Sequence, residues 1–91
     1  MANIHIKRTH NLGLDTARTE VEKIAQSLKS EIQADYAWSG NKLQFKRSGA
    51  SGTIDVGADF IDMDIRLGMA FSMLKGKIEE RINNKLDAAL S

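Results

Sequence analysis

The strongest constraint on the fold is a strict alternation of apolar and charged residues late in the chain. Its apolar members are Ile61, Met63, Ile65 and Leu67, and the residues between them are Asp62, Asp64 and Arg66. A period of two sends successive side chains to opposite faces of a β-strand. The segment therefore predicts a strand with one buried and one solvated face, in an antiparallel sheet that is covered on one side only.

Four further segments show the same period of two and predict further strands, over residues 3–9, 34–39, 42–47 and 53–56. Gly40 and Asn41 form a tight-turn pair between the second and third of these. A two-residue turn there pairs Trp38 with Leu43 and Tyr36 with Phe45. For the next hairpin, a longer turn over residues 49–52 is expected to set Phe45 opposite Val56.

Two segments instead repeat their apolar residues at helical spacing. The first stripe consists of Leu14, Ala17, Val21, Ile24, Ala25, Leu28 and Ile32, and the second of Phe71, Leu74, Ile78, Ile82, Leu86 and Ala89. The second helix is expected over residues 70–89. The predicted class is α+β, with the order β-α-β-β-β-β-α and two amphipathic helices packed on one face of the sheet. Residues 1–91 are read as a single domain.

Charge and composition exclude several classes of protein. Thirteen basic and twelve acidic residues give a net charge of +1. This balance lacks the basic excess of a nucleic-acid binder and gives no general attraction to anionic membranes. The chain has no cysteine, and no stretch approaches the roughly 20 apolar residues of a membrane span. We therefore expect a cytoplasmic protein that has no membrane span and binds no nucleic acid.

The residues most suited to catalysis or metal binding have structural explanations. His5 and His10 lie five residues apart in or beside the first strand, have no ligand-spaced partner, and are expected to be solvated. Four aspartates follow in the later strands and turns: Asp55, Asp59, Asp62 and Asp64. They lack the ordered spacing of a calcium loop and are expected to keep the outer sheet face soluble. We expect no catalytic residue, no metal site, no cofactor and no enzymatic activity.

Two groups of residues remain as candidates for binding. Tyr36, Trp38 and Phe45 share a sheet face, where they either form core beneath the helices or line an apolar cleft for an acyl chain or a partner's side chain. Met73 lies outside the apolar stripe of its helix. Because methionine adapts to many contact surfaces, Met73 indicates a partner-docking surface at that end of the helix.

The central hairpin also carries a family resemblance. Its residues are Tyr36-Ala37-Trp38-Ser39-Gly40-Asn41, followed by Leu43-x-Phe45-x-Arg47-x-Gly49-x-x-Gly52-x-Ile54-x-Val56. This ordered set resembles the polyhydroxyalkanoic acid system proteins, a bacterial family of about ninety residues also described as granule-region proteins. The resemblance implies a small accessory or regulatory protein of storage-polyester metabolism. It implies no catalytic or binding residue.

The leading functional hypothesis is a non-enzymatic accessory protein that contacts the storage granule or a granule-associated protein. The alternative is a small binder of a hydrophobic acyl ligand, built like the helix-grip proteins, in which a curved sheet is gripped by a helix. An open sheet also has edges that must be managed, so a homodimer formed through an edge strand or the uncovered face is plausible.

Overall fold

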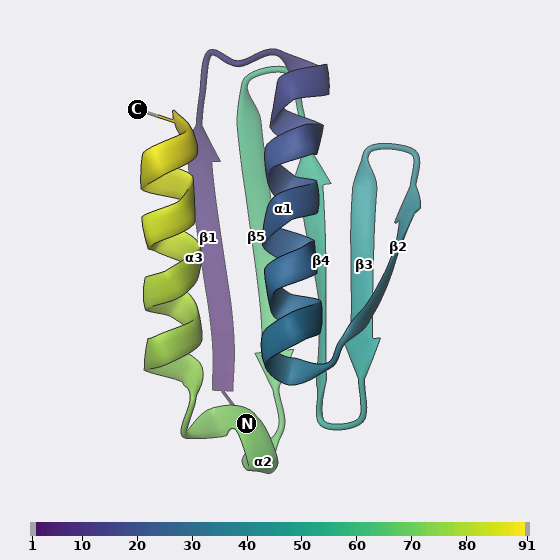
Figure 1. Cartoon of the computed structure of the whole chain (residues 1–91), viewed down its shortest axis with the longest axis vertical. Coiled ribbons are helices and arrows are strands. Elements are labelled where there is room, and N and C mark those ends of the chain that lie inside the picture. Colours follow the sequence, from purple (N-terminus) through teal and green to yellow (C-terminus); the bar gives the residue numbers. More distant parts are fainter. Residues whose placement is uncertain (1, 91) are drawn as a thin grey trace.

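The computed structural model describes residues 2–90 and contains one sheet and three helices within that range (Figure 1). The strands are β1 (Ala2–Thr9), β2 (Asp35–Ser39), β3 (Lys42–Arg47), β4 (Ala50–Val56) and β5 (Phe60–Leu67). The helices are α1 (Leu14–Ile32), α2 (Met69–Ser72) and α3 (Lys75–Leu90). The α+β class is therefore confirmed, with one short helix more than the two predicted.

The five strands form one antiparallel sheet in the order β1-β5-β4-β3-β2. Strands β2 to β5 follow one another as hairpins, and β1 pairs with β5 from the other side, with Ile4 opposite Ile65. Strands β1 and β2 are thus the two edges. Helices α1 and α3 lie side by side over the same face of the sheet, and no helix of residues 2–90 covers the other face (Figure 1).

The core lies between the sheet and the two long helices. Buried residues of the strands include Ile4, Leu43, Ile54, Ile61, Met63, Ile65 and Leu67. They face Ala17, Val21, Ile24, Ala25, Leu28 and Ile32 of α1 and Ile78, Ile82 and Leu86 of α3. Every one of these positions belongs to an apolar period of the sequence, because burying one stripe per element is what makes the layers stable.

The β3–β4 hairpin corrects the predicted register. Phe45 lies opposite Gly52 rather than Val56, because residues 48 and 49 alone make the turn and Gly49 adopts a φ of 89°. The shift is an even number of residues, so every side chain keeps its predicted face. A β-carbon on Gly52 would lie 2.5 Å from Cζ of Phe45. Gly52 therefore makes room for a ring and is not a turn residue. The predicted β2–β3 register is confirmed.

The predicted second helix is interrupted. It is divided into α2 and α3 by Met73 and Leu74, and only the later part of the predicted stripe is buried. Phe71 is half-buried, and 39% of Leu74 is exposed. The first helical segment ends at Ser72, and it packs against the β3–β4 turn. There the Gly68 N–H donates to the Gly49 carbonyl at 2.6 Å.

His10 is buried, contrary to the expectation of a solvated side chain. Only 6% of it is exposed. Its Nδ1 accepts the Leu12 backbone N–H at 3.1 Å, which leaves Nε2 as the atom that donates to the Phe60 carbonyl at 3.2 Å. The imidazole therefore closes the end of the β1–β5 pair and is used structurally. His5 remains exposed and contacts Asp62 through Nε2 at 2.9 Å.

Candidate functional site

Tyr36 and Trp38 meet the side of α1 at Glu22, and we call Glu22, Tyr36 and Trp38 the aromatic corner. The Trp38 indole N–H donates to one Glu22 carboxylate oxygen at 2.8 Å. The Tyr36 hydroxyl donates to the other oxygen. The Arg18 guanidinium stacks over the Trp38 ring, 4.6 Å from its centroid. Both rings are half-buried, and their polar atoms are satisfied by one carboxylate.

These contacts shift the protonation equilibria of the corner. The hydrogen bond from Tyr36, with a smaller one from Trp38, lowers the pKa of Glu22 below its ordinary value. The same bond to Glu22 raises the pKa of Tyr36. The corner is therefore held best when Glu22 is ionised and Tyr36 is protonated, which is the state at neutral pH.

A recess of about 500 Å³ opens beside Trp38. It is lined by Asp15, Arg18, Thr19, Glu22 and Trp38, so three of the five lining residues carry charge. Phe45, the third predicted ligand-binding residue, is only 3% exposed and lies in the core instead. The structure thus pairs Phe45 with Tyr36 across β2 and β3, as predicted, but Phe45 is buried whereas Tyr36 and Trp38 are half-buried. A lining of this kind does not favour a hydrocarbon chain.

The region around α2 differs in having bare apolar side chains. Met69 is 87% exposed and Met73 is 93% exposed. Together with Leu74 they are the exposed large hydrophobic residues within 2–90. We call Met69, Met73 and Leu74 the α2 tip. Met69 and Met73 are four residues apart, a spacing that puts two side chains on the same side of a helical turn. Figure 1 shows α2 beyond the end of the sheet.

The α2 tip is held to the body of the molecule from beneath. The Phe71 ring packs against Gly49 of the β3–β4 turn and under the Arg47 guanidinium, which lies 5.0 Å from the ring centroid. Arg47 also donates to the Ile32 carbonyl at the last residue of α1, at 2.6 Å. One side chain therefore joins α1, β3 and α2. The two methionines of the α2 tip thus flank a residue, Phe71, that packs on the body of the molecule.

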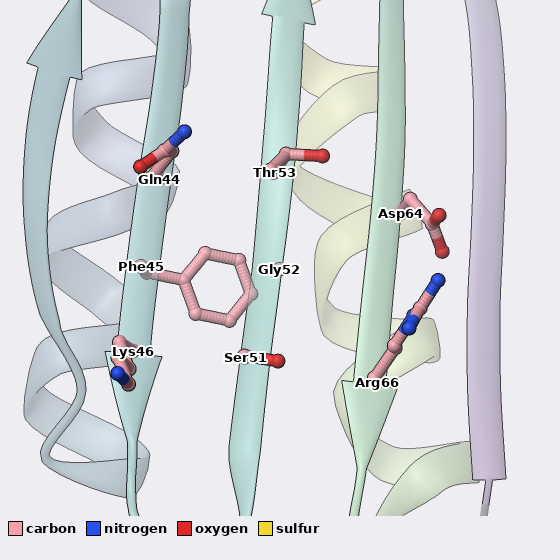
Figure 2. Close-up of a pocket in the computed structure, with 8 residues that line it drawn as sticks. All are labelled: Gln44, Phe45, Lys46, Ser51, Gly52, Thr53, Asp64 and Arg66. Atoms are coloured by element: carbon pink, nitrogen blue, oxygen red, sulfur yellow. The ribbon is translucent and has the colours of Figure 1, made fainter.

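A third candidate lies on the uncovered face of the sheet, where a shallow hollow of about 330 Å³ lies above Gly52 (Figure 2). Its lining residues are Gln44, Phe45, Lys46, Ser51, Gly52, Thr53, Asp64 and Arg66. Figure 2 shows the Arg66 side chain directed toward Asp64 of the same strand. The rim offers hydrogen-bonding groups, but the hollow is open to solvent and does not enclose a ligand as small-molecule sites do.

The predicted aspartates are dispersed on the solvated face and in the turns. The Lys42 Nζ atom lies 3.7 Å from Oδ1 of Asp55, and His5 contacts Asp62. Among residues 2–90, no three histidine or acidic side chains gather into a metal-binding group. No helix in the described range has the length and apolar content needed to cross a membrane.

Sequence reasoning missed two parts of these sites. Glu22 falls outside the apolar stripe of its helix, and only the paired sheet brings Tyr36 and Trp38 to it. Met69 precedes the predicted helix and becomes exposed because the helix is interrupted. Its spacing of four from Met73 was the available signal.

A family model with the description "Putative polyhydroxyalkanoic acid system protein" matches residues 4–90. Searches of curated proteins and of solved structures found no match. The matched range includes β1 from its third residue, the aromatic corner, the α2 tip and α3 up to its last residue. Because nearly the whole chain matches, as the pattern of the central hairpin indicated, this protein belongs to the family of polyhydroxyalkanoic acid system proteins.

Proposed function

We propose that this protein is a non-enzymatic accessory protein of polyhydroxyalkanoate metabolism that acts in the cytoplasm by contacting the storage granule or a protein on it. The family supplies the metabolic context. The observation that carries the contact is the α2 tip, where Met69 and Met73 are almost fully exposed. Soluble proteins avoid gathering such side chains in one place unless the surface is used.

The aromatic corner and the hollow on the sheet are less suited to binding than the α2 tip, and neither presents a feature that favours catalysis. The polar atoms of the aromatic corner are engaged by Glu22, so this region is assigned to holding α1 on the sheet. The hollow on the sheet is shallow and open. The α2 tip, in contrast, presents adaptable thioether side chains without a counterpart in the fold.

Localisation in cells that accumulate polyester tests the proposal. A fluorescent fusion of the full chain is expected to concentrate on granules, and M69S/M73S is expected to spread through the cytoplasm. Purified granules should retain the wild-type chain more strongly than the variant. A wild-type chain that spreads evenly while granules are abundant would overturn the proposal.

A matched variant separates the tip from the fold. Trp38→Phe keeps an aromatic ring, although a smaller one, and removes the indole N–H that reaches Glu22, while the α2 tip is unchanged. This variant should still concentrate on granules. Incubation of the wild-type chain with amorphous polyester should release no soluble hydroxy acid, since release would make the protein a hydrolase.

A further inference from the structure

We infer that the α2 tip binds an anionic lipid interface, inserting Met69 and Met73 while the neighbouring lysines contact the acidic headgroups. The inference rests on the proposed function and specifies the chemistry of the surface that is contacted. Its first support is the concentration of exposed apolar side chains, all within residues 69–74. A short amphipathic element with an exposed apolar side enters the boundary between headgroups and acyl chains.

The second support is the charge around the tip. From Leu67 to Lys77 the chain carries two basic residues, Lys75 and Lys77, and no acidic one. Lys77 is exposed, and Lys75 is half-buried at the first residue of α3. The overall charge of +1 therefore conceals a local positive region directly beside the methionines. Anionic lipid attracts each lysine held close to its surface.

The third support is that these lysines oppose a local rule of helix stability. The first turn of α3 contains no acidic residue, and Lys75 and Lys77 occupy it instead. The amino-terminal end of a helix carries a partial positive charge, so cations there are unfavourable. Violations of a local rule are expected at functional positions. An anionic surface at the tip would offset this repulsion.

The arrangement favours a lipid interface over a folded protein partner. The α2 tip stands beyond the end of the sheet (Figure 1). Two methionines and a leucine are too few side chains for the fully buried centre of a protein–protein interface of standard size. They suffice for weak and reversible insertion assisted by charge.

Sedimentation with vesicles tests the inference on the full-length protein. Wild-type chain is mixed with phosphatidylcholine vesicles, with or without about one third phosphatidylglycerol. Binding is expected to the mixed vesicles, to be much weaker on pure phosphatidylcholine, and to fall as salt screens the charges. M69S/M73S should bind at least about tenfold more weakly, because less apolar surface is inserted.

Charge variants provide the matched control. K75Q/K77Q should lose about tenfold or more on anionic vesicles. K7Q/K85Q removes the same charge from exposed positions on β1 and on the later part of α3, and it should bind nearly as well as the wild type. The melting temperature of each variant verifies that it is folded. Equal loss of vesicle binding in K75Q/K77Q and K7Q/K85Q would overturn the inference. Unchanged vesicle binding of M69S/M73S would also overturn it.

The failure of this inference and the failure of the proposed function can be distinguished. A wild-type chain that concentrates on granules but does not sediment with anionic vesicles overturns the lipid inference and leaves the granule role standing. A chain that binds vesicles but spreads evenly in granule-containing cells supports the lipid inference and overturns the granule role.

Discussion

The aromatic corner and the α2 tip both present large side chains at the surface, yet they are built in opposite ways. At the corner, Tyr36 and Trp38 are half-buried and share a carboxylate on α1. At the tip, Met69 and Met73 project outward, and the segment that carries them is held by the Phe71 ring and by the hydrogen bond from Gly68 to Gly49. The difference teaches that exposure alone does not identify a site. Tyr36 and Trp38 bind Glu22 within the fold, whereas the side chains of Met69 and Met73 remain accessible to a partner.

The largest effect is expected at Phe45, the buried aromatic residue that lies opposite Tyr36 of the corner. Phe45→Ala should lower the free energy of unfolding by about 3–5 kcal/mol, because a buried ring is replaced by a cavity. Trp38→Ala should cost clearly less, since that ring is half-buried. Urea unfolding measures both. A Trp38 cost as large as that of Phe45 would make the corner part of the core.

A smaller effect is expected at the support of the tip. Arg47→Met removes the hydrogen bond to the Ile32 carbonyl and the stacking on Phe71, and should cost about 1.5–3 kcal/mol. Lys46→Met, on the neighbouring exposed residue of the same strand, serves as the control and should cost less than about 0.5 kcal/mol. Equal costs, measured by urea unfolding, would show that the tip does not depend on Arg47.

The stabilisation that Glu22 gives to the aromatic corner should decrease at acidic pH. The folded-state pKa of Glu22 is lowered, so its contribution to stability is present above the ordinary glutamate pKa and lost as pH falls through the lowered value. Glu22→Gln should cost about 1 kcal/mol at neutral pH, because the amide cannot accept from both rings equally well. The difference between variant and wild type should shrink as pH falls below the ordinary glutamate pKa and through the lowered pKa of Glu22.

The alkaline side of the same titration has the opposite sign. The pKa of Tyr36 is raised, so the stability that its hydroxyl contributes is lost as pH rises through that higher value. Unfolding followed by the fluorescence of Trp38, the single tryptophan, reports both limits. Glu20→Gln is the control, since Glu20 lies outside the corner and pairs with the exposed Lys23, with 3.3 Å between Oε1 and Nζ. A pH-independent difference for Glu22→Gln would contradict the assigned direction.

The smallest effect on stability is expected at the tip itself. M69S/M73S should change the free energy of unfolding by less than about 0.5 kcal/mol, because both side chains are already in water. The same variant is the one expected to lose granule and vesicle binding. A marked loss of stability, measured by the same urea unfolding, would reduce the difference between the two regions to one of degree.

The sequence was sufficient for the parts of the fold that local periodicity controls. The period of two predicted which strand residues face the helices, and the stripe from Ala17 to Ile32 predicted the buried side of α1. The Gly40-Asn41 turn predicted the β2–β3 pairing. Each of these inferences depends on residues that are close together in the chain.

Features that depend on distant residues were missed. The burial of His10 depends on the Phe60 carbonyl, fifty residues away, and no local pattern indicates that contact. The predicted β3–β4 register was wrong because Gly52 resembles a turn residue. In the structure Gly52 lies within β4 and leaves room for the Phe45 ring of the paired strand β3. At the candidate site, Met73 was found by its misfit in the helical stripe. Glu22 required the folded sheet.

The pairing of Phe45 with Gly52 has a consequence for how this protein can change over generations. A methyl group at position 52 would lie 2.5 Å from the ring and 2.7 Å from the Asp64 carbonyl, so neither neighbour leaves it a place. Mutation at position 52 is therefore conditional on earlier change at position 45 and on a shift of the β5 backbone. Positions 45 and 52 are expected to co-vary among related sequences, whereas the residues of the outer sheet face can change independently of each other.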